Sequence, residues 1–266
     1  MGPLSGKRAL VCGSTRGIGR ACAFELARLG AQVTLLARDE EVLRQVRDQL
    51  PTTEPGTDAP LRHDYLLAEF SDPPSVQSAV VGHLEKTGPI QILLNNTGGP
   101  PAGPVFSADP DAFHAAFSSH LICNQLLAQA LVPGMKESSY GRIVNIISTS
   151  VKQPLKDLGV SNTIRAAVAN WAKTLAGELA PFGITVNNVL PGSTMTGRLS
   201  SLIQARARAA GAPVEEIERE MKREIPAGRF GTPEEIAAGV GFLATPAASY
   251  ITGINLPVDG GRTSSL

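Results

Sequence analysis

The chain contains 266 residues, of which 42% are hydrophobic and 18% charged, a composition typical of a globular protein and too apolar for a disordered one. Its 24 lysines and arginines balance its 24 aspartates and glutamates, so no net charge attracts nucleic acid or an anionic membrane, and we expect neither partner. The sequence shows no signal-like N-terminus and no run of 18 uncharged apolar residues, which predicts a soluble cytoplasmic protein. Cys12, Cys22 and Cys123 lack the spacing of a disulfide or zinc framework, so we expect no metal site.

Short apolar runs alternate with stretches of helical length over the first 95 residues. Strands are predicted at residues 9–12, 33–37, 64–70 and 90–95, and helices at 18–29, 40–50 and 73–86, with a surface loop at 51–60. Strands joined by crossovers of this length pair in parallel with their neighbours. The pattern therefore indicates β-α-β units.

The second half of the chain continues this alternation. Helices are predicted at 110–136, 161–180 and 233–244, and strands at 142–148, 184–190 and 255–258. Neither a repeat nor a linker interrupts the sequence. Residues 1–266 are therefore predicted to form a single doubly wound, Rossmann-like α/β domain around a central parallel sheet of about seven strands.

A glycine-rich segment lies between the first predicted strand and the first predicted helix. It consists of Gly13, Ser14, Thr15, Arg16, Gly17, Ile18 and Gly19. Glycine allows positive φ and a close approach of the backbone to a phosphate, and the free N–H groups of a helix start favour an anion. The segment predicts a nucleotide site, the alternative being a tight turn without a ligand.

The end of the second strand bears on the choice of cofactor. An acidic residue there would accept hydrogen bonds from a free ribose and repel a 2′-phosphate, whereas this chain has Arg38. Arg38 supplies a forked cation suited to phosphate, and Arg16 lies on the same side of the site. NADP(H) is therefore predicted over NAD(H). The alternatives are that both arginines are merely solvated, or that Asp39 pairs with Arg38.

Five segments of this sequence, in this order, make the chain resemble the short-chain dehydrogenase/reductase family, and in particular the 3-oxoacyl carrier-protein reductases. They are the glycine loop, residues 95–98, residues 141–148, Pro191-Gly192 and residues 258–261, and the resemblance extends from residue 7 to residue 261. It implies that Glu69 and Phe70 border the adenine, and that Asn96, with Gly98 in the same motif, lies along the ribose. It further implies that Pro191, Gly192, Thr194 and Thr196 flank the nicotinamide.

The resemblance also implies a catalytic serine, tyrosine and lysine with a supporting asparagine, and three of these four positions are changed. Ser148 matches the serine, Ser161 stands where the tyrosine belongs, Arg165 where the lysine belongs and His120 where the asparagine belongs. No Tyr-x-x-x-Lys sequence exists in the chain. A serine hydroxyl is a far weaker acid than a phenol and arginine stays protonated, so neither replacement is a ready proton donor. Arg165 could still bind the cofactor ribose.

The proton donor is therefore open at this stage. His120 is one candidate, because its ordinary pKa of about 6.5 suits proton exchange at neutral pH. Lys152 is another, if burial or Arg165 lowers its pKa. The alternatives are a helix histidine with a local hydrogen bond and a solvated loop lysine.

Two segments are expected to surround the substrate. Residues 197–230 form an insertion with helical runs at 199–210 and from 213, a lid candidate whose cations, Arg198 among them, are ascribed mostly to local ion pairs and solvation. The proline-stiffened loop 99–104 is expected to form part of the cleft wall.

The resemblance, together with the apolar Val168, Trp171 and Leu175 on one helix, implies a homo-oligomer, most simply a tetramer. These three residues could equally pack on the sheet.

These features favour an NADP-dependent oxidoreductase that transfers a hydride between nicotinamide and a carbonyl or alcohol substrate, with a divergent catalytic site. The cofactor segments favour an enzyme, since hydride chemistry resides in the cofactor. The missing phenol favours the alternative, a non-catalytic NADP-binding protein that acts by association or sensing. A third possibility is another reaction on the same scaffold that needs no tyrosine.

Overall fold

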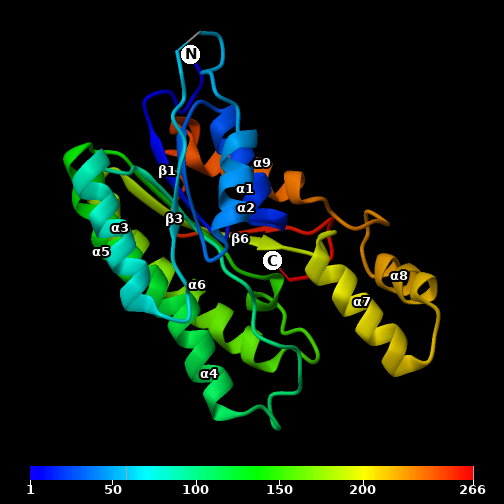
Figure 1. Ribbon diagram of the computed structural model, residues 1–266. Coiled ribbons are helices and arrows are strands. Elements are labelled where there is room, and N and C mark those ends of the chain that lie inside the picture. Colours follow the sequence, from blue (N-terminus) through cyan, green and yellow to red (C-terminus); the bar gives the residue numbers. More distant parts are fainter. Residues whose placement is uncertain (58, 266) are drawn as a thin grey trace.

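The computed structural model describes residues 1–57 and 59–265, and its centre is one parallel sheet (Figure 1). The strands are β1 (Arg8–Cys12), β2 (Gln32–Ala37), β3 (Asp64–Leu67), β4 (Ile92–Asn95), β5 (Gly141–Ile146), β6 (Ile184–Pro191) and β7 (Asn255–Val258). Their order in the sheet is β3-β2-β1-β4-β5-β6-β7, and every pairing is parallel. The predicted fold class is confirmed, with seven strands in the described chain.

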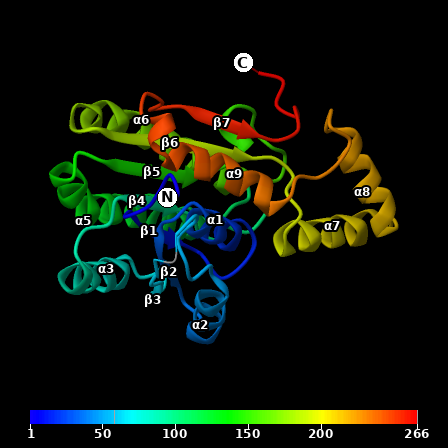
Figure 2. The same ribbon diagram turned by 90° about the horizontal axis from the view of Figure 1, so that it is seen from above.

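Helices cover both faces of the sheet (Figures 1 and 2). One face packs against α1 (Gly17–Arg28), α2 (Glu40–Gln49) and α9 (Pro233–Ala244), and the other against α3 (Pro73–Thr87), α5 (Cys123–Glu137) and α6 (Gly159–Leu179). The strands between these layers are apolar on both sides, as β1 and β4 illustrate. No helix of the described chain is long and apolar enough to span a membrane.

The helix predicted at 110–136 is interrupted. Residues Pro110–Phe117 form α4, residues Ser118–Ile122 form the π-helical turn η1, and α5 follows without a gap. The Ser119 hydroxyl donates to the carbonyl of Ala115 at 2.9 Å, just before the turn. Such turns are found often at functional sites, and this one holds His120. The hydrophobic pattern alone did not predict it, because a π turn changes the helical period over one turn only.

A line of four buried or half-buried asparagines crosses four strands. The side-chain amide of Asn95 donates to Asn145 at 2.8 Å, that of Asn145 to Asn188 at 2.9 Å, and that of Asn188 to Asn255 at 2.8 Å. The strand register places each of these residues directly beside the next. The line therefore joins β4, β5, β6 and β7 by side-chain hydrogen bonds in addition to the backbone ladder.

Helices α7 (Gly197–Ala210) and α8 (Val214–Arg223) stand apart from the layers of the domain (Figure 2). They pack on one another through a small apolar cluster of their own, made of Leu199, Ile203, Ala207, Ile217, Met221, Ile225 and Phe230. At the base of this unit, the N–H of Met195 donates to Gly231 at 2.8 Å and the N–H of Gly231 donates to Ser193 at 3.0 Å. The two ends of the inserted segment are thus joined side by side.

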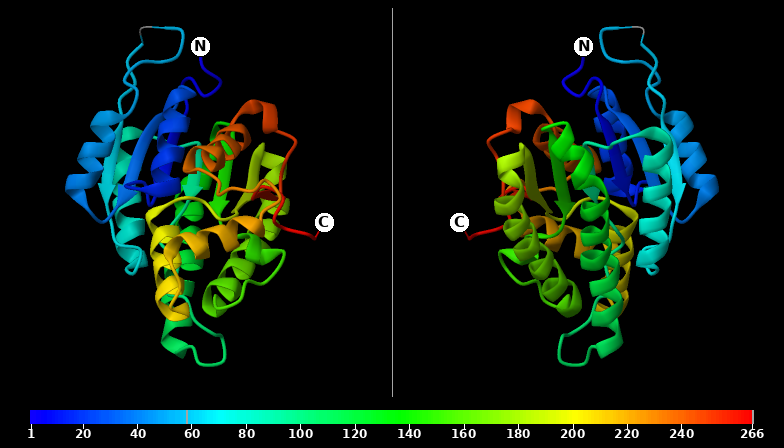
Figure 3. Two further views of the ribbon diagram at one scale, coloured as in Figure 1. Left: turned by 90° about the vertical axis from the view of Figure 1, so that its right-hand side faces the viewer. Right: turned by 90° about the vertical axis from the view of Figure 1, so that its left-hand side faces the viewer.

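Two further segments lie at the opposite end of the domain from the site (Figure 3). The chain after α2 extends beside the N-terminal residues, and Gly2 lies close to Pro55.

The remaining short turns are the 3₁₀ helices η2 (Thr149–Val151), η3 (Ala180–Phe182) and η4 (Pro246–Ala248). Of these, η2 matters here, because it follows Ser148.

Candidate active site

The candidate site lies where the strand order reverses, between β1 and β4. In an open parallel sheet, the crevice outside the carboxyl ends of the strands at this point is where ligands bind. The glycine loop follows β1 there, with φ of 59° at Gly13 and 54° at Gly17. A Cβ atom on Gly19 would lie 2.2 Å from the carbonyl oxygen of Gly13. A side chain is therefore disfavoured by the backbone conformation at Gly13 and Gly17 and by a clash at Gly19.

Two polar side chains complete this loop. The Asn96 amide, just after β4, donates to the carbonyls of Cys12 at 3.2 Å and Gly13 at 3.3 Å, which fastens the loop to the neighbouring strand. The Ser14 hydroxyl is fully buried and has no hydrogen-bond partner in the described chain. Arg16, the N-cap of α1, makes no side-chain capping bond, so the N–H groups of the first turn are uncapped. These donors fit a phosphate-bearing cofactor.

Arg38 lies at the end of β2 with 69% of its side chain exposed, and its guanidinium is 3.6 Å from the carboxylate of Glu69. Asp39 does not pair with Arg38, since its carboxylate caps α2 by accepting from the N–H of Val42 at 3.2 Å. The structure thus places the two residues expected at the adenosine end, Arg38 and Glu69, beside one another. An exposed pair at this distance is weak, so Arg38 can exchange its partner for a phosphate.

The remaining expected cofactor residues are brought to the same edge. Thr196 caps α7 and its methyl group would lie 3.4 Å from a Cβ on Gly17, so the start of α7 borders the glycine loop. Thr194 is buried, and its hydroxyl donates to the carbonyl of Gly192 at 3.2 Å, next to Pro191 at the end of β6. Phe70 packs partly against the core, and the Cys123 thiol donates to its carbonyl at 3.4 Å.

Ser148, Ser161 and Arg165 come from two adjacent elements. Ser148 follows β5, and its hydroxyl accepts from the N–H of Ser150 at 3.1 Å. Ser161 is buried on the first turn of α6, and Arg165 follows one turn later. The guanidinium of Arg165 donates to the carbonyl of Ile146 at 2.6 Å, two residues before Ser148. Burial lowers the pKa of Arg165 to about 10, so the group remains a cation at neutral pH.

His120 is buried, with 3% of its surface exposed, and its Nε2 has no hydrogen-bond partner in the described chain. Burial, followed by the charge of Arg165, lowers its pKa to about 3, although a hydrogen bond with the Gly98 backbone acts in the opposite direction. The expectation that His120 exchanges protons near its ordinary pKa is therefore wrong, because the imidazole is neutral at physiological pH. Sequence alone could not predict this, since the shift depends on tertiary burial.

The three tyrosines lie away from these groups. Tyr140 precedes β5, at the opposite end of that strand from Ser148, and donates to the carbonyl of Ala244 at 2.6 Å. Tyr65 is in β3 and donates to Glu40 at 3.2 Å, and Tyr250 is fully exposed. Lys152, the other proton-donor candidate, is the half-buried C-cap of η2. No phenol is therefore in place to substitute for Ser161.

Arg198 is the residue that sequence reasoning missed. The sequence pattern favours local ion pairs and solvation for this cation, yet its guanidinium donates to the carbonyls of Gly99 at 2.8 Å and Pro100 at 3.0 Å. The loop that begins with Gly99 is held on its other side, where the N–H of Gly103 donates to Asp157 at 2.7 Å and the N–H of Gly159 donates to Gly103 at 3.0 Å. This loop thus connects the α7–α8 unit to the start of α6.

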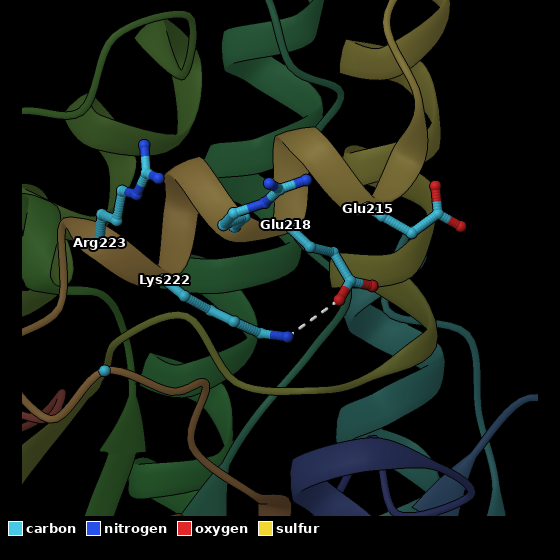
Figure 4. Close-up of a pocket in the computed structure, with 6 residues that line it drawn as sticks. Glu215, Glu218, Lys222 and Arg223 are labelled. Carbon is cyan, nitrogen blue, oxygen red and sulfur yellow. Dashed lines mark hydrogen bonds and ion pairs between the residues drawn. The ribbon is translucent and has the colours of Figure 1, made fainter.

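A separate open pocket of about 440 Å³ lies on α8 (Figure 4). Its lining comprises Glu215, Glu218, Arg219, Lys222, Arg223 and Gly228. Lys222 and Glu218 form an ion pair of 3.0 Å across one helical turn there. None of the residues expected in the active site lines this pocket, so it is distinct from the crevice at the sheet edge.

Comparison with known proteins agrees with this geometry. A family model described as "Enoyl-(Acyl carrier protein) reductase" matches residues 13–263, which is nearly the whole chain. The chain belongs to the short-chain dehydrogenase/reductase family. Within this family it is 32% identical over 260 residues to a 3-oxoacyl-[acyl-carrier-protein] reductase of Vibrio cholerae, covering 97% of this chain and 98% of the relative.

Other members have different printed activities. The chain is 32% identical over 275 residues to a cyclohexanol dehydrogenase of Rhodococcus sp., covering 99% of this chain and 98% of that one. Among solved structures, L-sorbose reductase from Gluconobacter frateurii, in complex with NADPH and L-sorbose, superposes with a TM-score of 0.91 at 29% identity, covering 99% and 98% of the two chains. The family and the enzyme class are thereby established. Because the relatives have different activities, the comparison does not identify the substrate, which must be inferred from the site.

Proposed function

We propose that the protein is an NADP(H)-dependent oxidoreductase that transfers a hydride between the nicotinamide and a carbonyl or alcohol substrate, with a divergent catalytic site. The observation that carries the proposal is the glycine loop, with its uncapped helix start and its buried, unpartnered Ser14 hydroxyl, joined to Arg38 at the end of β2. The NADPH complex of the Gluconobacter relative supports it.

In this proposal each part of the crevice holds one part of the cofactor. The backbone of Gly13–Gly19 binds the pyrophosphate, Arg38 binds the 2′-phosphate, and Thr194 and Thr196 flank the nicotinamide. When bound, NADPH supplies a hydride to a carbonyl carbon. Ser148 donates a hydrogen bond to the carbonyl oxygen, and Arg165 stabilises the negative charge that develops there.

The proton then needs a source other than an ionisable phenol. Ser161 is a very weak acid and His120 is neutral, so neither delivers a proton directly at neutral pH. In the proposal the proton reaches the carbonyl oxygen from solvent. Ser161 serves to line the site and does not act as an acid.

Cofactor preference tests the first part of the proposal. We expect NADPH to bind more tightly than NADH, and Arg38→Ala to remove most of the difference by weakening NADPH about ten- to a hundredfold, because one charge-assisted contact is lost. Calorimetric titration of both cofactors measures this. Arg44→Ala, on the exposed face of α2, is the matched control and should leave both affinities unchanged. Equal titration curves for the two cofactors in the parent protein would contradict the proposed preference for NADPH.

Turnover of the variants tests the second part. Ser148→Ala should lower kcat about a hundredfold or more for an aldehyde or ketone substrate, since a donor to the developing oxyanion is lost. Ser161→Ala should retain most activity, and neither the parent nor His120→Asn should lose rate between pH 5 and 8 through histidine titration, because the imidazole is already neutral. If Ser161→Ala abolishes turnover while Ser148→Ala does not, the roles assigned here are wrong.

A second function is favoured by one observation, the absence of any tyrosine beside Ser148 in the described chain. Without a phenol, the same cradle could hold NADPH in a non-catalytic protein that acts by association or sensing. A broad panel of ketones and alcohols distinguishes the two functions. Tight NADPH binding without turnover of any compound supports the second.

A further inference from the structure

Two arginines and a histidine come from segments near the carboxyl ends of the adjacent strands β4 and β5. Arg165 is held at the end of β5, and Arg198 is held by the loop after β4. The positive charge of Arg198 acts on both Arg165 and His120. The two guanidinium groups are held at segments that follow the paired strands β4 and β5, and the two arginines and His120 come from α6, α7 and η1.

Neither arginine is paired with a carboxylate in the part of the chain that the structure describes. Arg165 makes one hydrogen bond and Arg198 two, all to backbone carbonyls, whereas a guanidinium has five N–H donors. Both groups thus keep donors and full positive charge for another acceptor.

The position of Arg198 depends on the glycine beneath it. A Cβ atom on Gly99 would lie 2.8–2.9 Å from three atoms of the Arg198 guanidinium, so the planar head rests directly on the backbone. Its two bonds to the loop fix the plane of the fork at the wall of the cleft. Because Nη1 and Nη2 each donate to the loop, the edge formed by Nε–H and the second N–H of Nη2 remains for two parallel bonds to a planar carboxylate.

The cofactor does not supply the missing negative charge. Its phosphates, in the proposed function on which this inference rests, lie at the glycine loop and Arg38, at the other end of the crevice. We propose that the substrate is an oxo acid or the corresponding hydroxy acid, and that Arg198, assisted by the positive charge of Arg165, recognises its carboxylate. Because the imidazole of His120 is neutral, it adds no positive charge, and the two arginines bind the carboxylate.

Paired substrates test the inference through turnover. Pyruvate and longer 2-oxo acids are compared with their methyl esters, which keep the carbonyl and lose the charge. The parent should favour the acids in kcat/KM, and Arg198→Gln should reduce that preference about tenfold or more. Gly99→Ala should act in the same direction by displacing the guanidinium. Arg208→Gln, an equal change of charge on the exposed face of α7, should leave the preference unchanged.

The ratio of acid to ester distinguishes recognition from a structural role of Arg198 as a latch of the lid. A latch alone would lower kcat/KM for acids and esters equally. Equal use of acid and ester by the parent, or an unchanged ratio in Arg198→Gln, would overturn the inference.

Anion binding provides a readout that does not require turnover. Oxamate, a carboxylate that is not reduced, is titrated into the protein saturated with NADP⁺, which fills the phosphate sites. We expect saturable binding that weakens about tenfold in Arg198→Gln and is retained in Arg208→Gln. Oxamate binding without turnover of any carbonyl or alcohol would contradict the proposed function and leave the carboxylate site supported. Turnover of esters without oxamate binding would support the proposed function and contradict the carboxylate site.

Discussion

His120 shows how strongly a single residue departs from its solution behaviour in this fold. Its pKa falls from about 6.5 to about 3 because burial and the charge of Arg165 disfavour the imidazolium. The unfolded chain takes up this proton below pH 6.5 and the folded chain does not, so stability is full above pH 6.5 and declines as the pH falls toward 3. Between pH 7 and pH 5 the loss in unfolding free energy amounts to about 2 kcal/mol.

We therefore expect His120→Asn to lose less stability on acidification than the parent, by about 2 kcal/mol between pH 7 and pH 5. Urea unfolding at the two pH values measures this difference. The pKa values of His63 and His83 are also lowered by burial, but both residues are present in parent and variant and cancel in the comparison. His120→Gln repeats the test with a larger amide. The same pH dependence in all three proteins would refute the burial argument.

The residues of the cofactor crevice could be predicted from the sequence because their signal is local. Gly13 and Gly17 need positive φ within one loop, and Arg38 follows the apolar run of β2. Arg198 could not be found in this way, since its partners at Gly99 and Pro100 are about a hundred residues away in the chain. The pairing of Arg38 with Glu69 likewise depends on how β2 and β3 adjoin.

At the scale of elements, the strands and helices were largely predictable, since each carries its own hydrophobic period. Strand β7 and helix α9 lie at the predicted residues, whereas the 110–136 helix contains an unpredicted π turn. The asparagine line across β4–β7 was also not predicted. Each of its residues is polar within an apolar strand, and only the register reveals that the four side chains meet.

This line predicts a graded loss of stability. Asn145 both donates and accepts within the line, so Asn145→Ala removes two hydrogen bonds and leaves buried partners at Asn95 and Asn188. We expect a loss of about 2–4 kcal/mol in unfolding free energy. Asn255→Ala, at the end of the line, removes one bond of a half-buried pair and should cost about 1 kcal/mol. Equal losses, measured by urea unfolding, would show that the line does not act as a connected unit.

At the scale of the whole molecule, the domain leaves several large apolar side chains exposed. Phe117 and Ile122 are 41% and 37% exposed along α4 and η1, and Phe242 on α9 is 48% exposed. The residues that first motivated an assembly behave differently, since Val168 is buried and Trp171 and Leu175 pack partly against the core. For these three, packing on the body of the domain is the better explanation.

We still expect a homo-oligomer, most simply a tetramer, because exposed apolar surface on two separate elements favours association of copies. Multi-angle light scattering at micromolar concentration should give a mass of about four times 27.8 kDa. A particle of 27.8 kDa would contradict the expectation.

In the proposed function, this crevice performs hydride transfer although serines and an arginine occupy its reacting edge. The most direct measurement is the transfer of deuterium from NADPH labelled at the reactive carbon of the nicotinamide into the alcohol product, followed by mass spectrometry over a panel of ketones and oxo acids. We predict deuterium in the product formed by the parent protein, and about a hundredfold less labelled product per unit time from Ser148→Ala. NADPH binding that depends on Arg38, with no deuterium transferred to any compound, would contradict the claim.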